Sequence, residues 1–442
     1  MDGRGKHGNH DKMDDELKIL VRKFIGSLEA RESHYSRESN PHKLFLSSGS
    51  TKKKLYDQFI HEHPKFNPFV PEYVHNLRYW MFCKIFNEEF NIGIGFPRSD
   101  LCHVCELLHK REQVANRENN IEEIEQIQVE QRIHWENADV FYTAMRGAKL
   151  TDDSELILCC DFEKNFNLPI TGVNKEYFSS HMNIYNFGIN NLKTNQSTMF
   201  FYSENFARKG SNEVISFFVH YISQHATENT QHLTLFMDNA GGQNKNRFMF
   251  AFCQYLAYTR FETVKIIFPV PGHSFMPIDR EFAVIEKKRR KLDRAIKPSD
   301  WTKFLQCAKE QNPFEIVYVQ HSFTDDLQND GTPVVIVKNY KSALEPLFLS
   351  RIPIANIRRI EFRRGIEPQI QIDHRDGLND SLRMFKRTIN AEHLLVAFNT
   401  ANDCYPPGQF LSVAENSAEA VHDLLRFVDL PNSVTFYESV HP

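Results

Sequence analysis

Two aspartates each follow directly after a strongly apolar run of the sequence. Asp161 comes after the run LILCC, and Asp238 comes after the run LTLFM. Such runs predict buried strands, and the ends of neighbouring strands project side chains into a shared crevice. Carboxylates that converge there are the oxygen ligands that Mg²⁺ and Mn²⁺ prefer. A single aspartate at a strand end is more commonly an Asx turn or a helix cap, but two of them favour a site for divalent cations.

The third ligand of such a site would come from the helix predicted in HSFMPIDREFAVIEKK. Asp279 falls in the first turn after Pro277, and Glu286 lies two turns further along the same face. We rank Asp279 first, Glu286 second and Glu281 third. Two ions about 4 Å apart would activate a water or a 3′-hydroxyl and stabilise the leaving oxygen of a phosphodiester. The simpler interpretation is that Asp279 only offsets the helix dipole and Glu286 is a solvated charge.

The loop 239–247 (NAGGQNKNR), between Asp238 and the next predicted helix, carries groups that suit phosphate. Backbone amides at a helix N-terminus favour anions, although a plain turn is the simpler interpretation. The loop lacks the order of glycine, lysine and serine or threonine of a P-loop, which disfavours nucleoside triphosphate binding. We expect Lys245 and Arg247 to contact nucleic acid, with Asn239, Gln243, Asn244 and His273 in supporting positions.

Five consecutive cations follow the acid-bearing segment directly. This run is typical of a solvated face or a nuclear-import signal, but its place beside the predicted metal site also favours contacts with the DNA backbone. The residues of the run are Lys287, Lys288, Arg289, Arg290 and Lys291.

A Cys-x-x-Cys pair, Cys102 and Cys105, supplies half of a zinc site. His134, with His109 as a further candidate, could complete the tetrahedral coordination of a structural zinc ion. A reduced pair without metal is the competing interpretation. The eight cysteines are too sparse for a disulfide scaffold. A redox role is not expected, because no thioredoxin-like βαβ pattern surrounds the pair.

Composition excludes several classes of protein. The chain has 442 residues, 41% of them apolar and 12% aromatic, which excludes disorder as the main state. Its 53 basic and 57 acidic residues nearly balance, so nucleic-acid contacts would depend on local basic patches. No apolar run is long enough for a membrane span and the N-terminus has no signal-peptide core, so we expect an intracellular protein without membrane association.

The N-terminal part of the chain is predicted to be helical. Residues 1–40 are polar and read as a flexible tail with one amphipathic helix. Residues 41–150 form a helical region in which two helices could make a helix-turn-helix or simply pack on each other. A longer charged segment predicts an exposed helix or helical hairpin. These helices are expected over 17–28, 51–63, 70–90 and 106–146.

The rest of the chain alternates strands and helices. Residues 151–314 predict the order three strands, helix, strand, helix, strand, helix, which is typical of a ribonuclease H-like mixed α/β sheet flanked by helices. Residues 315–442 predict short strands and a helix at 416–428, which we interpret as a small, β-rich α+β domain.

Several strings of the sequence resemble those of a known group of proteins. They are PRSDLCHVC, DFEKNFNLP, YNFGI, RKGSNEVISF, MDNAGGQNKN and PGHSFMPIDREFAVIE. On residues 40–295 the chain is similar to an uncharacterised, transposon-derived arthropod family whose members resemble DDE-type transposases. The resemblance implies a ribonuclease H-like catalytic core and an upstream Cys-x-x-Cys module. The matching positions are Asp161, Asp238, Asp279 and the recurrent acid Glu286, with Cys102 and Cys105 upstream.

These features together predict a metal-dependent polynucleotidyl transferase or nuclease that acts on DNA phosphodiesters in the nucleus. Two Mg²⁺ or Mn²⁺ ions would serve the reaction, and a structural zinc ion is a further expected cofactor. DNA is the expected partner, and the resemblance also implies a homo-oligomer. The competing prediction is a domesticated, catalytically inactive nucleic-acid-binding or interaction protein that keeps the fold.

Overall fold

The computed structural model divides the chain into two compact units, residues 1–127 and 128–442. The division falls inside helix α5 (Ile121–Ala148). No helix in the described part of the chain is long and apolar enough to cross a membrane. The structure describes residues 15–28, 30–32, 43–46, 50–66, 77–95, 102–319, 333–372, 377–378, 380–386, 390–406, 410–427, 436–437 and 440.

The N-terminal unit has a core of three amphipathic helices, α1 (Asp15–Gly26), α2 (Lys52–Glu62) and α3 (Tyr79–Glu89). Three short strands, β1 (Arg31–Glu32), β2 (Leu44–Leu46) and β3 (Ile92–Ile94), form a small sheet in that order. The helices expected over 17–28 and 51–63 are present. The start expected at Pro71 lies outside the described residues, and the described part of that helix begins at Tyr79. A helix-turn-helix role stays a prediction.

A helical hairpin follows, as the charged segment predicts. Helix α4 (His103–Arg117) is joined to α5 by a short turn in which Asn119 has a φ of 51°. The first turns of α5 pack on α4 through a small apolar cluster that includes Leu108 and Ile127. Arg111 of α4 forms an ion pair with Glu123 of α5 at 2.6 Å.

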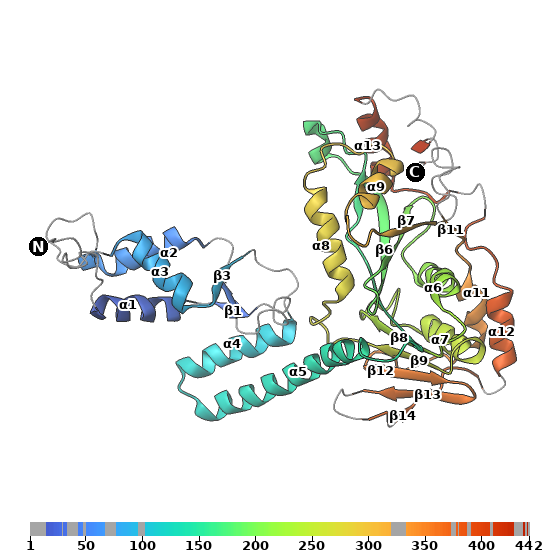
Figure 1. Cartoon of the computed structure of the whole chain (residues 1–442), viewed down its shortest axis with the longest axis horizontal. Helices are drawn as coiled ribbons and strands as arrows, with labels where there is room; N and C mark the ends of the chain where they lie inside the picture. The colour runs from blue at the N-terminus through green and yellow to red at the C-terminus, as the bar shows by residue number, and fades with distance from the viewer. Residues whose placement is uncertain are drawn as a thin grey trace, which may run out of the picture. The chain divides into compact units, whose positions relative to one another are not determined.

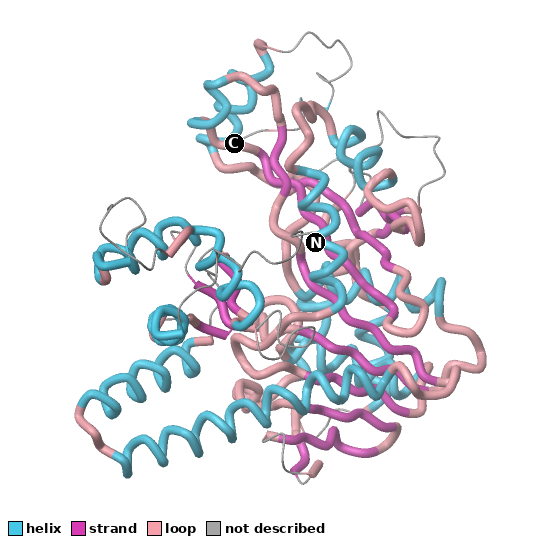
Figure 2. The backbone as a smooth tube through the Cα atoms, turned by 60° about the vertical axis from the view of Figure 1, so that its left-hand side comes forward, coloured by secondary structure: helices cyan, strands magenta, loops and turns pink. Residues whose placement is uncertain are grey.

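The centre of the second unit is a mixed sheet. Its strands β7, β6, β4, β8 and β9 lie in that spatial order, and Figure 2 shows them side by side. β6 is antiparallel to β4 and β7, whereas β8 is parallel to both β4 and β9. This confirms the predicted mixed α/β sheet and its order of elements. The strands are β4 (Glu155–Phe162), β6 (Met182–Asn191), β7 (Ser197–Ser203), β8 (His232–Met237) and β9 (Thr263–Ile267), with the short β5 (Phe166–Leu168) beside β6.

Strands from the last third of the chain extend this sheet at both edges. β10 and β11 follow β7 on one side, while β12, β13 and β14 follow β9 on the other. The boundary expected at residue 315 is therefore wrong for the sheet, because short strands give no sequence signal of the partner they pair with. These strands are β10 (Glu315–Val319), β11 (Val334–Val335), β12 (Arg359–Arg363), β13 (Ile366–Gln371) and β14 (Asp380–Ser381).

Helices cover both faces of the sheet (Figure 1). Alternate strand residues face opposite sides, so that Cys160 lies in one core and Cys159 in the other. One face is covered by α6 (Ser211–His225), α7 (Arg247–Thr259), α11 (Tyr340–Leu344) and α12 (Ala391–Asn399). The other is covered by the C-terminal part of α5 with α8 (Pro277–Arg289), α9 (Pro298–Gln306) and α13 (Glu415–Leu425).

Candidate functional site

Asp161 and Asp238 leave the sheet next to each other. β4 and β8 are parallel neighbours in which Cys160 lies opposite Met237, and the two aspartates are the next residues along each strand. Both side chains belong to half-buried residues. This is the arrangement that the two apolar runs predict, because parallel strands end at the same edge of a sheet.

A third carboxylate lies close enough to act on this pair. The pKa of Asp161 is raised well above its usual range, mainly by burial and then by the charges of Asp238 and Asp279. Asp279 stands in the first turn of α8, where its Oδ2 accepts a hydrogen bond from the Met276 N–H at 2.7 Å. Three carboxylates from three elements therefore share one electrostatic environment, which a cation would stabilise.

The loop after β8 holds Asp238 in place. Asp238 Oδ1 accepts hydrogen bonds from Asn244 Nδ2 at 2.6 Å and from the Ala240 N–H at 3.2 Å. Asn244 is fully buried, and its Oδ1 has no hydrogen-bond partner in the described part of the chain. Asn239 Nδ2 donates to the Pro269 carbonyl at 2.8 Å. The amide-rich loop thus holds Asp238 in position. Gln243 is half-buried, and its N–H donates to the Ala240 carbonyl at 3.2 Å.

Lys245 is not available for phosphate, contrary to expectation. It is 7% exposed, and its Nζ donates to Asn239 Oδ1 and to the Ala355 carbonyl, each at 2.9 Å. Burial lowers the pKa of Lys245 to about 8. Arg247 is also engaged within the protein, since its Nη2 lies 2.5 Å and 2.6 Å from the two carboxylate oxygens of Glu345.

The basic run differs along its length. α8 ends at Arg289, whose Nη1 donates to the Asn165 carbonyl at 3.3 Å and lies 3.5 Å from Glu286 Oε2. Lys288 Nζ donates to the Cys307 carbonyl at 2.8 Å. Four residues of the run, Lys287, Lys288, Arg290 and Lys291, are exposed, and Arg289 is half-buried. Contact of this run with DNA stays a prediction.

The two lower-ranked acids of α8 have different surroundings. Glu281 is 7% exposed and its Oε2 forms an ion pair with Lys309 Nζ at 2.8 Å. This ion pair links α8 to the segment that follows α9. Glu286 keeps a partly exposed carboxylate beside Arg289. The charge of Asp279 helps to raise the pKa of Asp161.

Sequence reasoning missed Glu163, which lies two residues after Asp161. Glu163 is 5% exposed, and burial raises its pKa to about 8. The hydrogen bond from Asn186 and the charges of Arg289 and Lys209 oppose that shift only in part. Its sole signal in the sequence is the spacing Asp-x-Glu, which places both side chains on one face of an extended chain.

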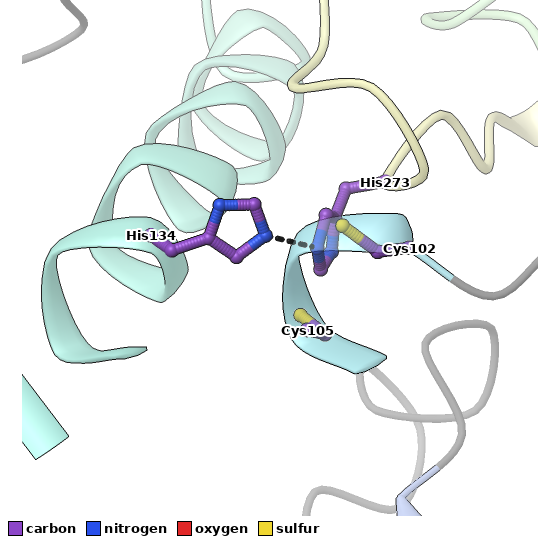
Figure 3. Close-up of side chains that lie close together, drawn as sticks. All are labelled: Cys102, Cys105, His134 and His273. Carbon is purple, nitrogen blue, oxygen red and sulfur yellow. Dashed lines mark hydrogen bonds between the residues drawn. The ribbon is translucent and has the colours of Figure 1, made fainter. Parts of the chain in front are cut away.

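A second cluster contains two thiols and two imidazoles. Cys102, Cys105, His134 and His273 each offer one ligand atom, and these atoms all lie within 4.8 Å of one another (Figure 3). This Cys/His group could hold a metal ion. Cys102 is the N-cap residue of α4 and Cys105 lies in its first turn, so both face the same side of the helix.

The two histidines of this group are in direct contact. His134 Nε2 lies 3.0 Å from His273 Nε2, and the Tyr142 hydroxyl donates to the His273 carbonyl at 3.0 Å. His273, which the sequence places only in a supporting role, thus takes the position expected for His109. His109 Nε2 instead lies 3.2 Å from Gln113 Nε2, one turn along α4.

Part of the second unit matches a known family model. Residues 176–328 match the family model of DUF7869, a domain of unknown function, and this range contains Asp238 and Asp279. No curated protein matches the chain. Among solved structures the chain is similar to "Crystal structure of NurA with manganese", at 10% identity and a TM-score of 0.15. That similarity covers 73% of this chain and 65% of the other, just under two thirds of its length.

Proposed function

We propose that the second unit is a metal-dependent nuclease or polynucleotidyl transferase that acts on DNA phosphodiesters. The observation that carries the proposal is the meeting of Asp161 and Asp238 at the ends of two neighbouring parallel strands, with Asp279 near enough to raise the pKa of Asp161. The strand order, with β4 at the centre, supports a core of the ribonuclease H type.

The donor set fits divalent cations that prefer oxygen. The acids supply carboxylate oxygens, and the fully buried Asn244 adds an amide oxygen without a hydrogen-bond partner in the described residues, next to Asp238. Bound Mg²⁺ or Mn²⁺ would activate a water or a 3′-hydroxyl and stabilise the leaving oxygen. Asp161, Asp238 and Asp279 would hold the ions, and Asn244 would orient Asp238.

The phosphate backbone would be held by cations near this edge. Lys287 in the last turn of α8 is exposed, as are Arg290 and Lys291 just after it. Arg289 donates a hydrogen bond to the carbonyl of Asn165, the residue before β5. Backbone contacts of this kind are independent of DNA sequence and weaken with salt. A DNA substrate also implies nuclear localisation, and the basic run resembles segments read by nuclear import.

We further propose that the Cys/His group binds structural zinc. Two thiolates and two imidazoles are a common ligand set of closed, tetrahedral zinc sites. The ligand atoms are already gathered within 4.8 Å of one another. At zinc–nitrogen distances of about 2.0 Å, two imidazole nitrogens lie about 3.3 Å apart in a tetrahedral site. The 3.0 Å separation of the His134 and His273 Nε2 atoms is close to that value.

Cleavage of a labelled DNA by the purified chain tests the proposed function. We expect cleavage with Mg²⁺ or Mn²⁺, loss of cleavage in EDTA, and recovery when the metal is restored. Binding of DNA that depends on salt, without cleavage under any metal condition, would contradict the proposal and support a domesticated, inactive protein instead.

A further inference from the structure

Glu163 and its neighbour Asn186 on β6 form a buried polar pair beside the three aspartates. Glu163 follows β4 directly and is 5% exposed. Its Oε2 accepts a hydrogen bond from Asn186 Nδ2 at 2.8 Å, whereas its Oε1 is buried without a hydrogen-bond partner in the described part of the chain. A buried carboxylate oxygen in that state is costly, because the water it lost has not been replaced.

Asn186 carries a second buried oxygen of the same kind. It is fully buried on β6, and its backbone carbonyl accepts a hydrogen bond from the Glu163 N–H at 2.9 Å. The Nδ2 donates to Glu163, but the Oδ1 has no hydrogen-bond partner in the residues that the structure describes. Two adjoining residues therefore each present one carboxylate or amide oxygen without a donor. Oxygens of these two types are ligands for a hard divalent cation.

These oxygens lie on the same side of the sheet as Asp161. The intervening Phe162 packs against the core of α6 and α7, so its two neighbours point to the opposite face, which α8 covers. Two residues of α8, Glu286 and Arg289, act electrostatically on Glu163. The side chains of Asp161 and Glu163 are therefore neighbours on the face of the sheet that α8 covers.

The cations around Glu163 do not satisfy its Oε1. Lys209 Nζ lies 2.5 Å from Asn165 Oδ1 and 3.5 Å from the backbone carbonyl of Glu163, and it stands 4.9 Å from the centre of the Phe162 ring. Arg289 is directed to the Asn165 carbonyl and to Glu286. Both contribute positive charge nearby, yet neither donates a hydrogen bond to the Glu163 carboxylate in the described residues.

We propose that Glu163 and Asn186 hold a second divalent cation, with Asp161 shared between this position and the one at Asp238 and Asp279. The inference rests on the proposed function, because it assigns ligands to the second of the two ions. It adds two residues, one carboxylate and one amide, to the site. Mg²⁺ or Mn²⁺ is the class of ligand, because both oxygens are hard donors.

Counting bound Mn²⁺ tests this assignment. The full-length chain, as purified, is titrated with Mn²⁺, and free Mn²⁺ is measured by its electron paramagnetic resonance signal. Mn²⁺ should not displace zinc from thiolates and imidazoles, since it is the weaker binder of the two. We expect about two Mn²⁺ per wild-type chain and about one in Glu163→Gln, which keeps the size of the side chain and removes its charge.

Two further variants make the result specific. Asn186→Leu removes the amide oxygen on β6 and should also bind about one Mn²⁺, so the test does not depend on a single folded variant. Glu228→Gln is the matched control, because Glu228 is exposed in the loop before β8, at the end of that strand opposite Asp238. It should retain wild-type binding.

The outcomes separate the two proposals. Wild-type protein that binds a single Mn²⁺, or a Glu163→Gln variant that still binds as many ions as the wild type, overturns the assignment of Glu163 and leaves the three aspartates in place. Wild-type protein that binds no Mn²⁺ overturns the metal site as a whole, and with it the proposed function.

Discussion

Gly188 of β6 lies opposite Asp161 of β4, and a Cβ at position 188 would come within 2.5 Å of Ile278 Cδ1 on α8. The same Cβ would lie 2.9 Å from Phe282 Cε1. The absence of a side chain at Gly188 therefore lets α8 pack closely on the sheet beside Asp161. That packing brings Asp279 to the edge where the strand-end aspartates emerge.

Gly188→Ala should therefore destabilise the protein and disturb the site. Overpacking of this kind costs about 1–3 kcal/mol in the free energy of unfolding. Because α8 would have to shift, we also expect weaker Mn²⁺ binding. Urea denaturation and Mn²⁺ titration measure the two effects.

Gly241→Ala is the control for this substitution. Nothing lies within 4 Å of a Cβ at Gly241, and its φ is not positive. The free energy of unfolding should change by less than about 0.5 kcal/mol. Equal destabilisation by both substitutions would show that close packing of α8 is not the cause.

Asp279 rather than Glu286 should be the third acid. Asp279 acts on Asp161, whereas Glu286 is paired with Arg289 further along α8. We expect Asp279→Asn to lower metal-dependent cleavage by about 100-fold or more and Glu286→Gln to lower it by less than about 10-fold. Initial cleavage rates at saturating Mg²⁺ provide the comparison.

Asp279 also caps the N-terminus of α8, so Asp279→Asn should lower the stability of the protein as well as its cleavage rate. Its Oδ2 accepts the Met276 N–H, and weakening that contact should cost about 1 kcal/mol. Assays well below the melting temperature of the variant avoid this effect. A Glu286→Gln variant that loses more cleavage than Asp279→Asn would reverse the ranking.

Zinc content should depend on His273 and not on His109. His273→Ala removes one of the four gathered ligands and should reduce zinc from about one ion per chain to a small fraction. His109→Ala, on the same helix as the two cysteines, should keep its zinc. Metal analysis of the purified proteins measures both. Retention of zinc by His273→Ala with loss in His109→Ala would restore the ligand set expected from the sequence.

Acid should weaken the contact between Glu315 and His225. A hydrogen bond from His225, together with one from Thr198, lowers the pKa of Glu315 below its usual value. A carboxyl group whose pKa is lower in the folded state stabilises that state above the pKa of the unfolded chain, about 4.5, and this stability is lost as the pH falls through the folded-state pKa.

Glu315→Gln should therefore cost less than about 1 kcal/mol near neutral pH, because the side chain is partly exposed. The difference from wild type should shrink as the pH falls from about 4.5 through the lower, folded-state pKa of Glu315. Unfolding measured between pH 3 and about pH 7 tests this. A difference that grows as the pH falls would have the wrong sign.

The sequence predicts the centre of the sheet well for a clear physical reason. Buried strands such as β4 and β8 appear as uninterrupted apolar runs, and the acids that follow them stand out. The position of Asp161 beside Asp238 follows once the strands are known to be parallel neighbours. Gly188 carries no comparable signal, because its role depends on how closely α8 packs against the sheet.

The sequence misassigns or misses residues whose surroundings come from distant parts of the chain. Lys245 reads as a loop cation, but contact with Ala355 buries it. His273 lies 139 residues from the histidine that it contacts, so ligand spacing could not identify it. Glu163 looks like one polar residue of a loop until Asn186 of β6 is placed beside it. In each case the deciding contact is long-range, and local sequence patterns do not encode it.

Cleavage of DNA by Asp161→Asn and Asp238→Asn, measured beside the wild type, tests the central claim most directly. Each substitution keeps the size of its side chain and removes a charge from the end of β4 or β8. We predict metal-dependent cleavage by the wild type and a loss of about 100-fold or more in both variants, whose folding is checked by thermal unfolding. Cleavage at the wild-type rate by either folded variant would contradict the account.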